Sequence, residues 1–376
     1  MKIIYISDNK IYKCTDGKIT ELSSERAQHY KSTVSEIRRN KEWKHSGTGA
    51  QFMGTAAPSG NEAVFVSING IADDGTGLVY SIQLGEMGGI YRKNPDKPEA
   101  AEEHIFTGMN RDIGSISIKN GKIAACSNGH LSIFDMKGNF EDITDGDSIE
   151  SQPCWSAEDD RIFCSTAGIA RNQYGAPAAY SPRSIMAVDL NAGSMEELYA
   201  DEKYDFLRPS NDSSGNFYYI RQPYKVPEEK NPLWKDVLLF PVRIIKALMG
   251  FLNAFSVLFG GESLRSGRKQ GDVKTKDKSD RELFFEGRLL EAEKNEKENS
   301  AKGEKNPGIF PLSRVLVRIA PDGTETVLKR GVMDYAVLSD GSIVCSNGRS
   351  LLHITDSGEE LIAKAKMAQN ICVLGD

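Results

Sequence analysis

Short apolar runs separated by polar turns recur along most of the chain. A Cys-Ser-Asn-Gly sequence at 126–129 returns at 345–348, each time after an apolar run, and Cys-Ser at 164–165 follows an apolar pair in the same way. Polar turns precede these runs, for example at 118–121 and 338–341. A third run, a second turn and a closing run complete each unit, which predicts four short strands joined by tight turns. Such sheets must stack on their neighbours, because one sheet alone cannot bury both faces.

The chain contains six units if the N-terminal and C-terminal segments together form one of them. The first unit, over residues 2–22, lacks an opening strand, and a spare apolar run stands at 371–374. Pairing of this run with the first unit would leave no open sheet edge between the ends of the chain. The sequence therefore predicts an all-β fold, a six-bladed β-propeller closed by pairing of its N- and C-terminal strands.

One blade of this propeller carries a long insertion. We expect residues 1–221 to form blades one to five, the fifth only in its first part. Residues 222–312 form a mostly helical and disordered insertion in blade five, and residues 313–376 complete the propeller, including the closing strand.

The opening of one unit matches a known repeat. Residues 153–160 read Pro-Cys-Trp-Ser-Ala-Glu-Asp-Asp and are followed by an apolar strand, and residues 337–341 are a weaker copy. This pattern resembles the TolB-type six-bladed propeller repeat, Pro-x-Trp-Ser-Pro-Asp-Gly before an apolar strand. The resemblance implies the fold and no particular activity, because propellers serve as scaffolds, sensors and enzymes.

The net charge and the N-terminal sequence limit the expected partners and cellular location. A net charge of −6 speaks against a nucleic-acid partner, which requires a basic face. Met1 and Lys2 run directly into a strand that is too short for a signal peptide. We expect a cytoplasmic protein, placed at the inner face of the membrane if it is attached to lipid.

The six cysteines are expected to be free. Cys126, Cys164 and Cys345 occupy the same position of three different units, so they belong to different sheets. That position accepts a small apolar residue, and a free thiol behaves as one. No Cys-x-x-Cys pair or grouped histidine indicates a metal site, and we predict none.

No sequence motif predicts catalysis. The five histidines lack metal-ligand spacing, and neither a Gly-x-Ser-x-Gly elbow nor a phosphate-binding glycine loop is present. We therefore predict no catalytic residue and no cofactor, and expect His130 and His353 to be structural. The acidic pairs at 102–103 and 359–360 are expected to be solvated edge charges. An enzyme or small-ligand sensor that uses the central channel remains the alternative.

Four long connections define a candidate functional face. Connections at about 24–48, 68–89, 167–182 and 222–312 each follow the second or fourth strand of a predicted blade. Because neighbouring strands alternate in direction, all four should emerge on the same face, and long loops on a rigid scaffold often bind ligands. The first connection contains a predicted helix over 25–44, which we expect to cap the ring.

The largest connection contains an apolar helix predicted over 232–259. Polar or small residues recur along it every three to four positions and form a narrow polar stripe. Both ends of the insertion belong to one blade, so a simple membrane crossing would split that blade. We expect the helix to lie in the interface of an anionic membrane surface. The residues expected to bind the membrane or a partner are Trp234, Leu238, Phe240, Arg243, Ile244, Ile245, Lys246, Leu248, Phe251, Leu252, Phe255, Leu258 and Phe259.

Other roles for this helix stay open. It could dock on a protein partner, form a homo-oligomer through 232–259, or fold back on the propeller. Residues 262–309 are rich in charge, so we predict a disordered tether with a short helix over 281–294. Basic residues over 265–278 would favour anionic lipid. The sequence thus favours a non-enzymatic binding or scaffold module that is attached to a membrane surface or partner through the inserted helix.

Overall fold

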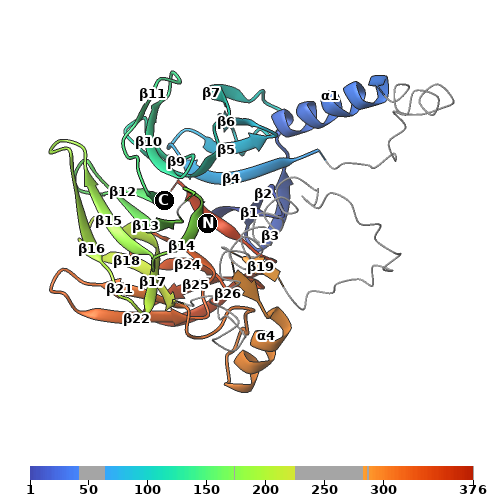
Figure 1. Cartoon of the computed structure of the whole chain (residues 1–376). Coiled ribbons are helices and arrows are strands. Elements are labelled where there is room, and N and C mark those ends of the chain that lie inside the picture. The colour runs from blue at the N-terminus through green and yellow to red at the C-terminus, as the bar shows by residue number, and fades with distance from the viewer. Residues whose placement is uncertain (42–63, 173, 225–282, 286–287, 376) are drawn as a thin grey trace, which may run out of the picture.

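Six antiparallel sheets, each built on four strands in succession, form a ring (Figure 1). The computed structural model describes residues 1–41, 64–172, 174–224, 283–285 and 288–375. The innermost strands β4, β8, β12, β17, β23 and β27 contact one another in this order, and β27 contacts β4 in turn. An all-β six-bladed propeller is therefore confirmed.

The strands of each blade follow one another from the propeller axis outward. Blade one contains β27 (Gln369–Leu374), β1 (Lys2–Ser7), β2 (Lys10–Thr15) and β3 (Lys18–Leu22), and blade two contains β4 (Val66–Asp73), β5 (Leu78–Leu84), β6 (Met87–Lys93) and β7 (Glu103–Met109). Blade three contains β8 (Ile113–Lys119), β9 (Lys122–Ser127), β10 (His130–Asp135) and β11 (Phe140–Asp142), and blade four contains β12 (Ser148–Trp155), β13 (Arg161–Arg171), β15 (Ser184–Asp189) and β16 (Ser194–Tyr199). Blade five contains β17 (Tyr204–Asn211), β18 (Phe217–Pro223), β21 (Val315–Ile319) and β22 (Glu325–Arg330), and blade six contains β23 (Asp334–Val337), β24 (Ile343–Ser346), β25 (Ser350–Thr355) and β26 (Gly358–Lys364).

The remaining elements lie outside these sheets. Strand β14 (Pro177–Tyr180) pairs with the extended end of β13, and β19 (Leu283–Phe285) forms a hairpin with β20 (Arg288–Leu290). The helices in the described part of the chain are α1 (Glu25–Lys41), between blades one and two, and α4 (Ala292–Ala301), in the insertion of blade five.

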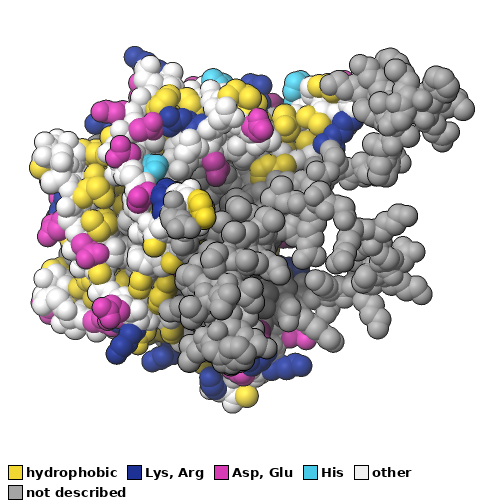
Figure 2. All heavy atoms as spheres, viewed as in Figure 1, with side chains coloured by type: hydrophobic (Ala, Val, Ile, Leu, Met, Phe, Trp, Pro, Cys, Tyr) yellow, Lys and Arg dark blue, Asp and Glu magenta, His cyan; other side chains and the backbone are white. Residues whose placement is uncertain are grey.

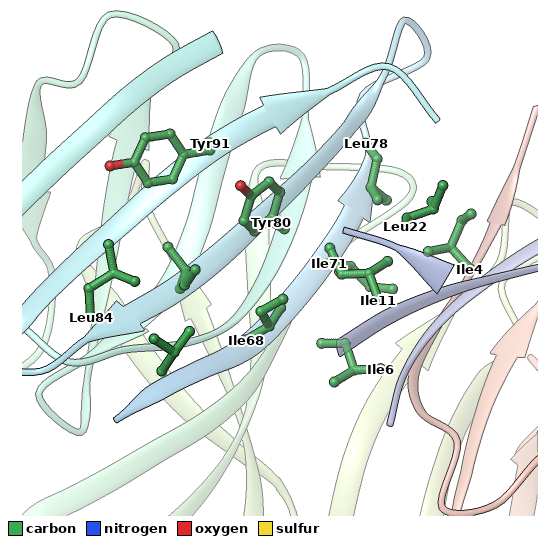
Figure 3. Packing of buried hydrophobic residues seen from close by; sticks show 12 residues of the cluster. Ile4, Ile6, Ile11, Leu22, Ile68, Ile71, Leu78, Tyr80, Leu84 and Tyr91 are labelled. Carbon is green, nitrogen blue, oxygen red and sulfur yellow. The ribbon is translucent and has the colours of Figure 1, made fainter. Parts of the chain in front are cut away.

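The core consists of buried clusters at the blade interfaces. In the cluster of Figure 3, Ile4, Ile6 and Ile11 of blade one pack against Ile71 and Leu78 of blade two. Equivalent clusters join each of the other blades to the next, and one of them joins blade six to blade one. Each blade thus buries both faces, as the repeat requires.

The two ends of the chain meet in blade one. Strand β27 pairs antiparallel with β1, with Lys2 opposite Leu374 and Ile4 opposite Cys372. The N-terminal segment therefore supplies the second strand of the blade, and the C-terminal segment supplies the innermost one.

Two of the predicted long connections are strands instead. Residues 68–89 form most of β4, all of β5 and the start of β6, because the true opening strand of blade two begins at Val66. The polar Ser67 and Asn69 interrupt its apolar pattern and hide it in the sequence. Residues 167–182 extend β13 and pair it with β14.

The predicted helix after blade one is present, but it does not cap the ring. Helix α1 begins at Glu25 and points outward from the ring (Figure 1). Tyr30 packs against the core between blades one and two, whereas Ile37 is 46% exposed.

The predicted tether is ordered over the part that the structure describes. Residues 288–309 contain β20 and α4, and Ala292, Asn299 and Ile309 are buried. The predicted helix over 281–294 is wrong as well, because the described residues before Ala292 form a hairpin. The prediction of disorder was based on the high charge of this segment. A few buried side chains are enough to hold its described part in a defined structure.

Candidate functional site

The innermost strands carry a ring of polar residues around the propeller axis. In β4, β8, β12, β17 and β27 the pairing with the neighbouring strand shifts register at one point. A bulge at such a point redirects the side chains that flank it. The residues at these bulges, together with the first residue of β23, form what we call the axial belt: Asn69, Ser115, Gln152, Arg208, Asp334 and Asn370.

Arg208 joins three neighbouring blades of the belt. Its amide donates to Gln152 Oε1 at 2.7 Å, and its guanidinium Nη1 lies 3.1 Å from Asp334 Oδ2. The Gln152 amide in turn donates to Ser115 Oγ at 3.0 Å. These contacts bridge blades three to four, four to five and five to six.

Asn370 joins the remaining blades. Its amide donates to Asp334 Oδ2, and its Nδ2 donates to the carbonyl oxygen of Asn69 at 2.9 Å. Asn69 Nδ2 then donates to the carbonyl oxygen of Ile113 at 2.9 Å. Every blade interface is therefore crossed by a hydrogen bond at the level of the belt.

Three belt residues adopt a left-handed backbone. The φ angles of Gln152, Arg208 and Asn370 are +56°, +51° and +50°. This conformation costs a non-glycine residue about 1–2 kcal/mol, so the hydrogen bonds across the blades offset local strain. Proline follows the first two of these residues, at 153 and 209. A residue before proline in an opening strand is the sequence signal that could have located the belt.

The charged centre of the belt is largely buried. The side chain of Arg208 is 14% exposed and that of Asp334 is 2% exposed. Tyr335 donates its hydroxyl to the carbonyl oxygen of Arg208 at 2.6 Å, and burial raises the pKa of Tyr335 well above its usual range. The phenol therefore stays a neutral donor, and these contacts fix the conformation of Arg208.

No described histidine belongs to the belt. His130 Nδ1 is 3.2 Å from Glu150 Oε2, and His353 Nε2 is 3.0 Å from Ser342 Oγ, contacts that agree with the predicted structural role of both side chains. His104 lies on the outermost strand of blade two. No group of His, Cys, Asp and Glu suited to a metal ion occurs among the described residues.

The cysteines fill the core as predicted. All six are free, and Cys126, Cys164 and Cys345 are buried. Burial raises the pKa of Cys164 to about 11 and that of Cys345 to about 12. The thiols are therefore protonated at neutral pH and poorly suited to nucleophilic chemistry.

Two of the predicted edge charges are structural instead. The side chain of Glu102 is fully buried; it accepts the amides of Glu25 and Arg26 at 3.1 Å each and lies 3.5 Å from Lys93 Nζ. Glu359 Oε2 lies 2.8 Å from Lys329 Nζ. Adjacent acidic residues in the sequence do not reveal such partners, which come from other strands.

The second candidate region is the face from which the insertion of blade five emerges. The apolar helix predicted over 232–259, with every residue expected to bind a membrane or partner, lies outside the described residues. In the described part of the chain, no helix is both long and apolar enough to span a membrane. The described C-terminal part of the insertion packs on the ring: Leu290, Ile309 and Phe310 cluster with Met333 and, at the margin, with Met367, just before β23 and β27.

A buried arginine holds the described C-terminal part of the insertion, residues 288–312, which we call the return segment. Arg314 is 2% exposed, and its Nε donates to the carbonyl oxygen of Val332 at 2.8 Å. Its Nη1 donates to Gln222 Oε1 at 2.6 Å, which joins the two ends of the insertion. The guanidinium also lies 5.5 Å from the ring centre of Phe310, within the range of a cation–π contact.

Comparison with known proteins shows the fold. The sequence matches no protein-family model and no curated protein. A nidogen–laminin complex structure matches with a TM-score of 0.50 at 7% identity, covering 99% of this chain and 98% of that one. TolB from Acinetobacter baumannii matches with a TM-score of 0.48 at 10% identity; the alignment covers 99% of this chain and 66% of that chain, about two thirds of its length.

A gluconolactonase from Xanthomonas campestris matches with a TM-score of 0.41 at 9% identity, covering 82% of this chain and 77% of that one. At such identities the likeness extends to the fold and not to activity. Together with the ring of six sheets, the match to the nidogen–laminin complex structure shows a six-bladed β-propeller fold, and the Pro-x-Trp-Ser opening of blade four resembles the TolB-type repeat.

Proposed function

We propose that this propeller is a non-enzymatic binding or scaffold module that is attached to an anionic membrane surface through residues 232–259. The observation that carries the proposal is where the insertion starts and ends. It leaves after β18 and returns at β21, neighbouring strands in which Arg221 lies opposite Val315. A helix between these points can lie on a surface without dividing the blade, as an interfacial helix does.

The way in which the insertion is held supports this role. Arg314 and Gln222 clamp its two ends together, and the segment after 288 packs on the ring. A helix carried between such ends would be presented from one defined side of a rigid body. The basic residues over 265–278 would add attraction to anionic lipid.

The axial belt favours binding over catalysis. Arg208 and Asp334, its charged members, bond to each other and to neighbouring blades. A group committed to holding blades together is poorly placed to transfer protons or bind a transition state. The alternative is a small-ligand sensor or enzyme that uses the central channel, and this charged pair on the axis is the observation in its favour.

We also infer that the pairing of β27 with β1 closes the ring. Strands from the two ends of the chain then hold the first and last blades together, and the insertion acts from a closed body. The proposal places the protein in the cytoplasm, at the inner face of the membrane. A protein partner, or a second copy bound through 232–259, is the competing target of the helix.

The test is co-sedimentation of the full chain with vesicles of phosphatidylcholine alone or with added phosphatidylserine. The matched variant lacks residues 231–261, and gel filtration and circular dichroism report assembly and folding. We expect binding to the anionic vesicles that the deletion strongly weakens while the propeller stays folded. If neither protein sediments and the deletion turns an oligomer into a monomer, the helix is an assembly element and the membrane proposal is wrong.

A further inference from the structure

Helix α1 begins at a firmly fixed point. Ser24 Oγ accepts the amide of Ala27 at 3.1 Å and lies 2.9 Å from the hydroxyl of Tyr80. Glu102 accepts the two preceding helical amides, so the first turn is capped twice. Lys93 Nζ donates to the carbonyl oxygen of Ser23 at 2.6 Å. The direction of the helix is thus set by buried polar groups of blade two.

Burying this charged pair is costly. The side chains of Lys93 and Glu102 are both 0% exposed. A buried ion pair often contributes less stability than a well-packed apolar pair of similar volume. Its position at the start of α1 indicates that it serves to orient the helix, which points outward from the ring (Figure 1).

One face of α1 passes from the ring into solvent. At 100° per residue, Tyr30, Val34 and Ile37 fall on one side of the helix. Tyr30 packs against the core of blades one and two, whereas Ile37, two turns further on, is 46% exposed. Figure 2 shows hydrophobic and basic side chains together where Figure 1 places α1.

The charge of the exposed half is opposite to that of the whole chain. Residues 31–40 contain Lys31, Arg38 and Arg39 against the single acidic Glu36, all of them exposed, whereas the chain carries a net charge of −6. By helical geometry, Lys31 and Arg38 lie along one edge of the apolar side, about 60° and 40° from Val34 around the helix axis, and Arg39 lies on the opposite side. An apolar stripe beside basic residues is typical of a helix that lies on an anionic lipid surface.

We propose that the outer half of α1 is a second contact with the anionic membrane surface. This inference rests on the proposed function. Helix α1 follows the outermost strand of blade one, and the insertion follows the second strand of blade five; antiparallel alternation places both on the same face of the ring. Two contacts on one face would fix the orientation of the propeller on the membrane and strengthen binding through their linkage.

The test compares adjacent arginines in the full chain. Arg38→Glu reverses a charge on the apolar side, and Arg39→Glu makes the same change on the opposite side. We measure co-sedimentation with phosphatidylserine-containing vesicles at several salt concentrations. Because a basic residue close to an anionic surface has a considerable effect, we expect Arg38→Glu to weaken binding about tenfold and Arg39→Glu less than about threefold. The difference should shrink at high salt.

The deletion of 231–261 separates this inference from the proposed function. Residual, salt-sensitive binding of the deletion variant that Arg38→Glu removes would support the role of α1. Equal effects of the two arginine variants would overturn it and leave the membrane role of the insertion intact. Both proposals would be overturned if the wild-type chain bound neither kind of vesicle. They would also be overturned if the chain bound polyglutamate, a soluble anionic polymer without lipid, and no vesicle.

Discussion

At the residue scale, Arg208 combines two unfavourable features that the fold retains. Its backbone is left-handed, with φ of +51°, and its guanidinium is largely buried. Both are tolerated because its amide, carbonyl and side chain bond to blades four, six and one. Asp334 is its charged partner. Arg208 therefore acts as a junction between blades.

Replacing Arg208 tests this role. Arg208→Ala leaves the buried Asp334 without its cation, so we expect a loss of about 3 kcal/mol in the free energy of unfolding. Arg208→Gly removes the same ion pair, but glycine adopts the left-handed backbone of residue 208 without strain. The glycine variant should therefore be about 1 kcal/mol more stable than the alanine variant. Urea unfolding measures both. An alanine variant as stable as Arg161→Ala, which removes a half-exposed ion pair with Asp159, would contradict the assigned role.

A second residue-scale prediction concerns pH. The bidentate contact with Arg111 lowers the pKa of Asp142 to about 2, with a further contribution from Ser132. A carboxylate whose pKa is lower in the folded than in the unfolded state adds stability above about pH 4, and that stability is lost as the pH falls through about 2. Asp142 is half-exposed, so solvent screening limits the effect to under about 1 kcal/mol.

We expect wild type and Asp142→Asn to differ in unfolding free energy at pH 7 and to converge between about pH 4 and pH 2. Urea unfolding across this range checks the prediction. A difference that stays constant from pH 7 to pH 2 would exclude titration of Asp142 as its source.

The sequence predicted the role of residues that occupy the same position in several blades. The cysteines were predictable because three blades place the same small apolar residue in the same position. Glu102 was not, because its partners are the helix start at Glu25 and the amine of Lys93, which the fold alone brings together. A residue whose role depends on a single non-repeated contact leaves no pattern in one sequence.

At the element scale, the return segment of the insertion shows how few contacts order a charged stretch. Residues 292–301 form a helix with a mostly solvated surface, yet Asn299 is 2% exposed. Its Nδ2 donates to the carbonyl oxygens of Gly308 and Phe310 at 2.8 and 2.9 Å. The amide thereby ties α4 to the segment that leads into β21 of blade five. Composition averages over such residues, so it predicted disorder for this segment.

Asn299→Ala should release this segment. The substitution removes the donor to two carbonyl groups near the ring, which we expect to cost about 2 kcal/mol locally. Amide hydrogen exchange in α4 should rise markedly while that of the blades changes little, because the segment can open without unfolding the ring. Lys297→Ala, on the exposed side of the same helix, is the matched control. Equal exchange in the two variants would show that Asn299 does not hold the helix.

At the scale of the whole molecule, neighbouring blades are joined at two distances from the propeller axis. The apolar clusters join neighbouring blades, and the belt joins the same blades at the axis. The repeat predicts the clusters, because apolar strands must be covered. The belt depends on bulges, which add a residue to one strand and break the regular pattern, so counting strands does not reveal it. The same effect displaced the predicted start of blade two.

The pairing of β27 with β1 should be essential to the whole ring. Deletion of residues 369–376 removes the innermost strand of blade one, which leaves Ile3 and Ile4 uncovered and removes Asn370 from the belt. Burial at the interfaces of blade one with blades two and six would be lost together. We therefore expect a loss comparable to the total stability of a typical domain, about 5–15 kcal/mol. Deletion of residues 375–376 alone, beyond the strand, should cost about 1 kcal/mol or less.

Addition of the missing strand in trans makes this prediction specific. A synthetic peptide of residues 366–376 should restore cooperative unfolding of the truncated chain, because β27 binds through backbone pairing with β1 and through side chains such as Ile371 and Cys372 that face neighbouring clusters. A peptide with Asn370→Ala should restore it less well, since it lacks the hydrogen bond to Asn69. A truncated chain that unfolds cooperatively and with native stability without the peptide would mean that the ring closes by blade packing alone.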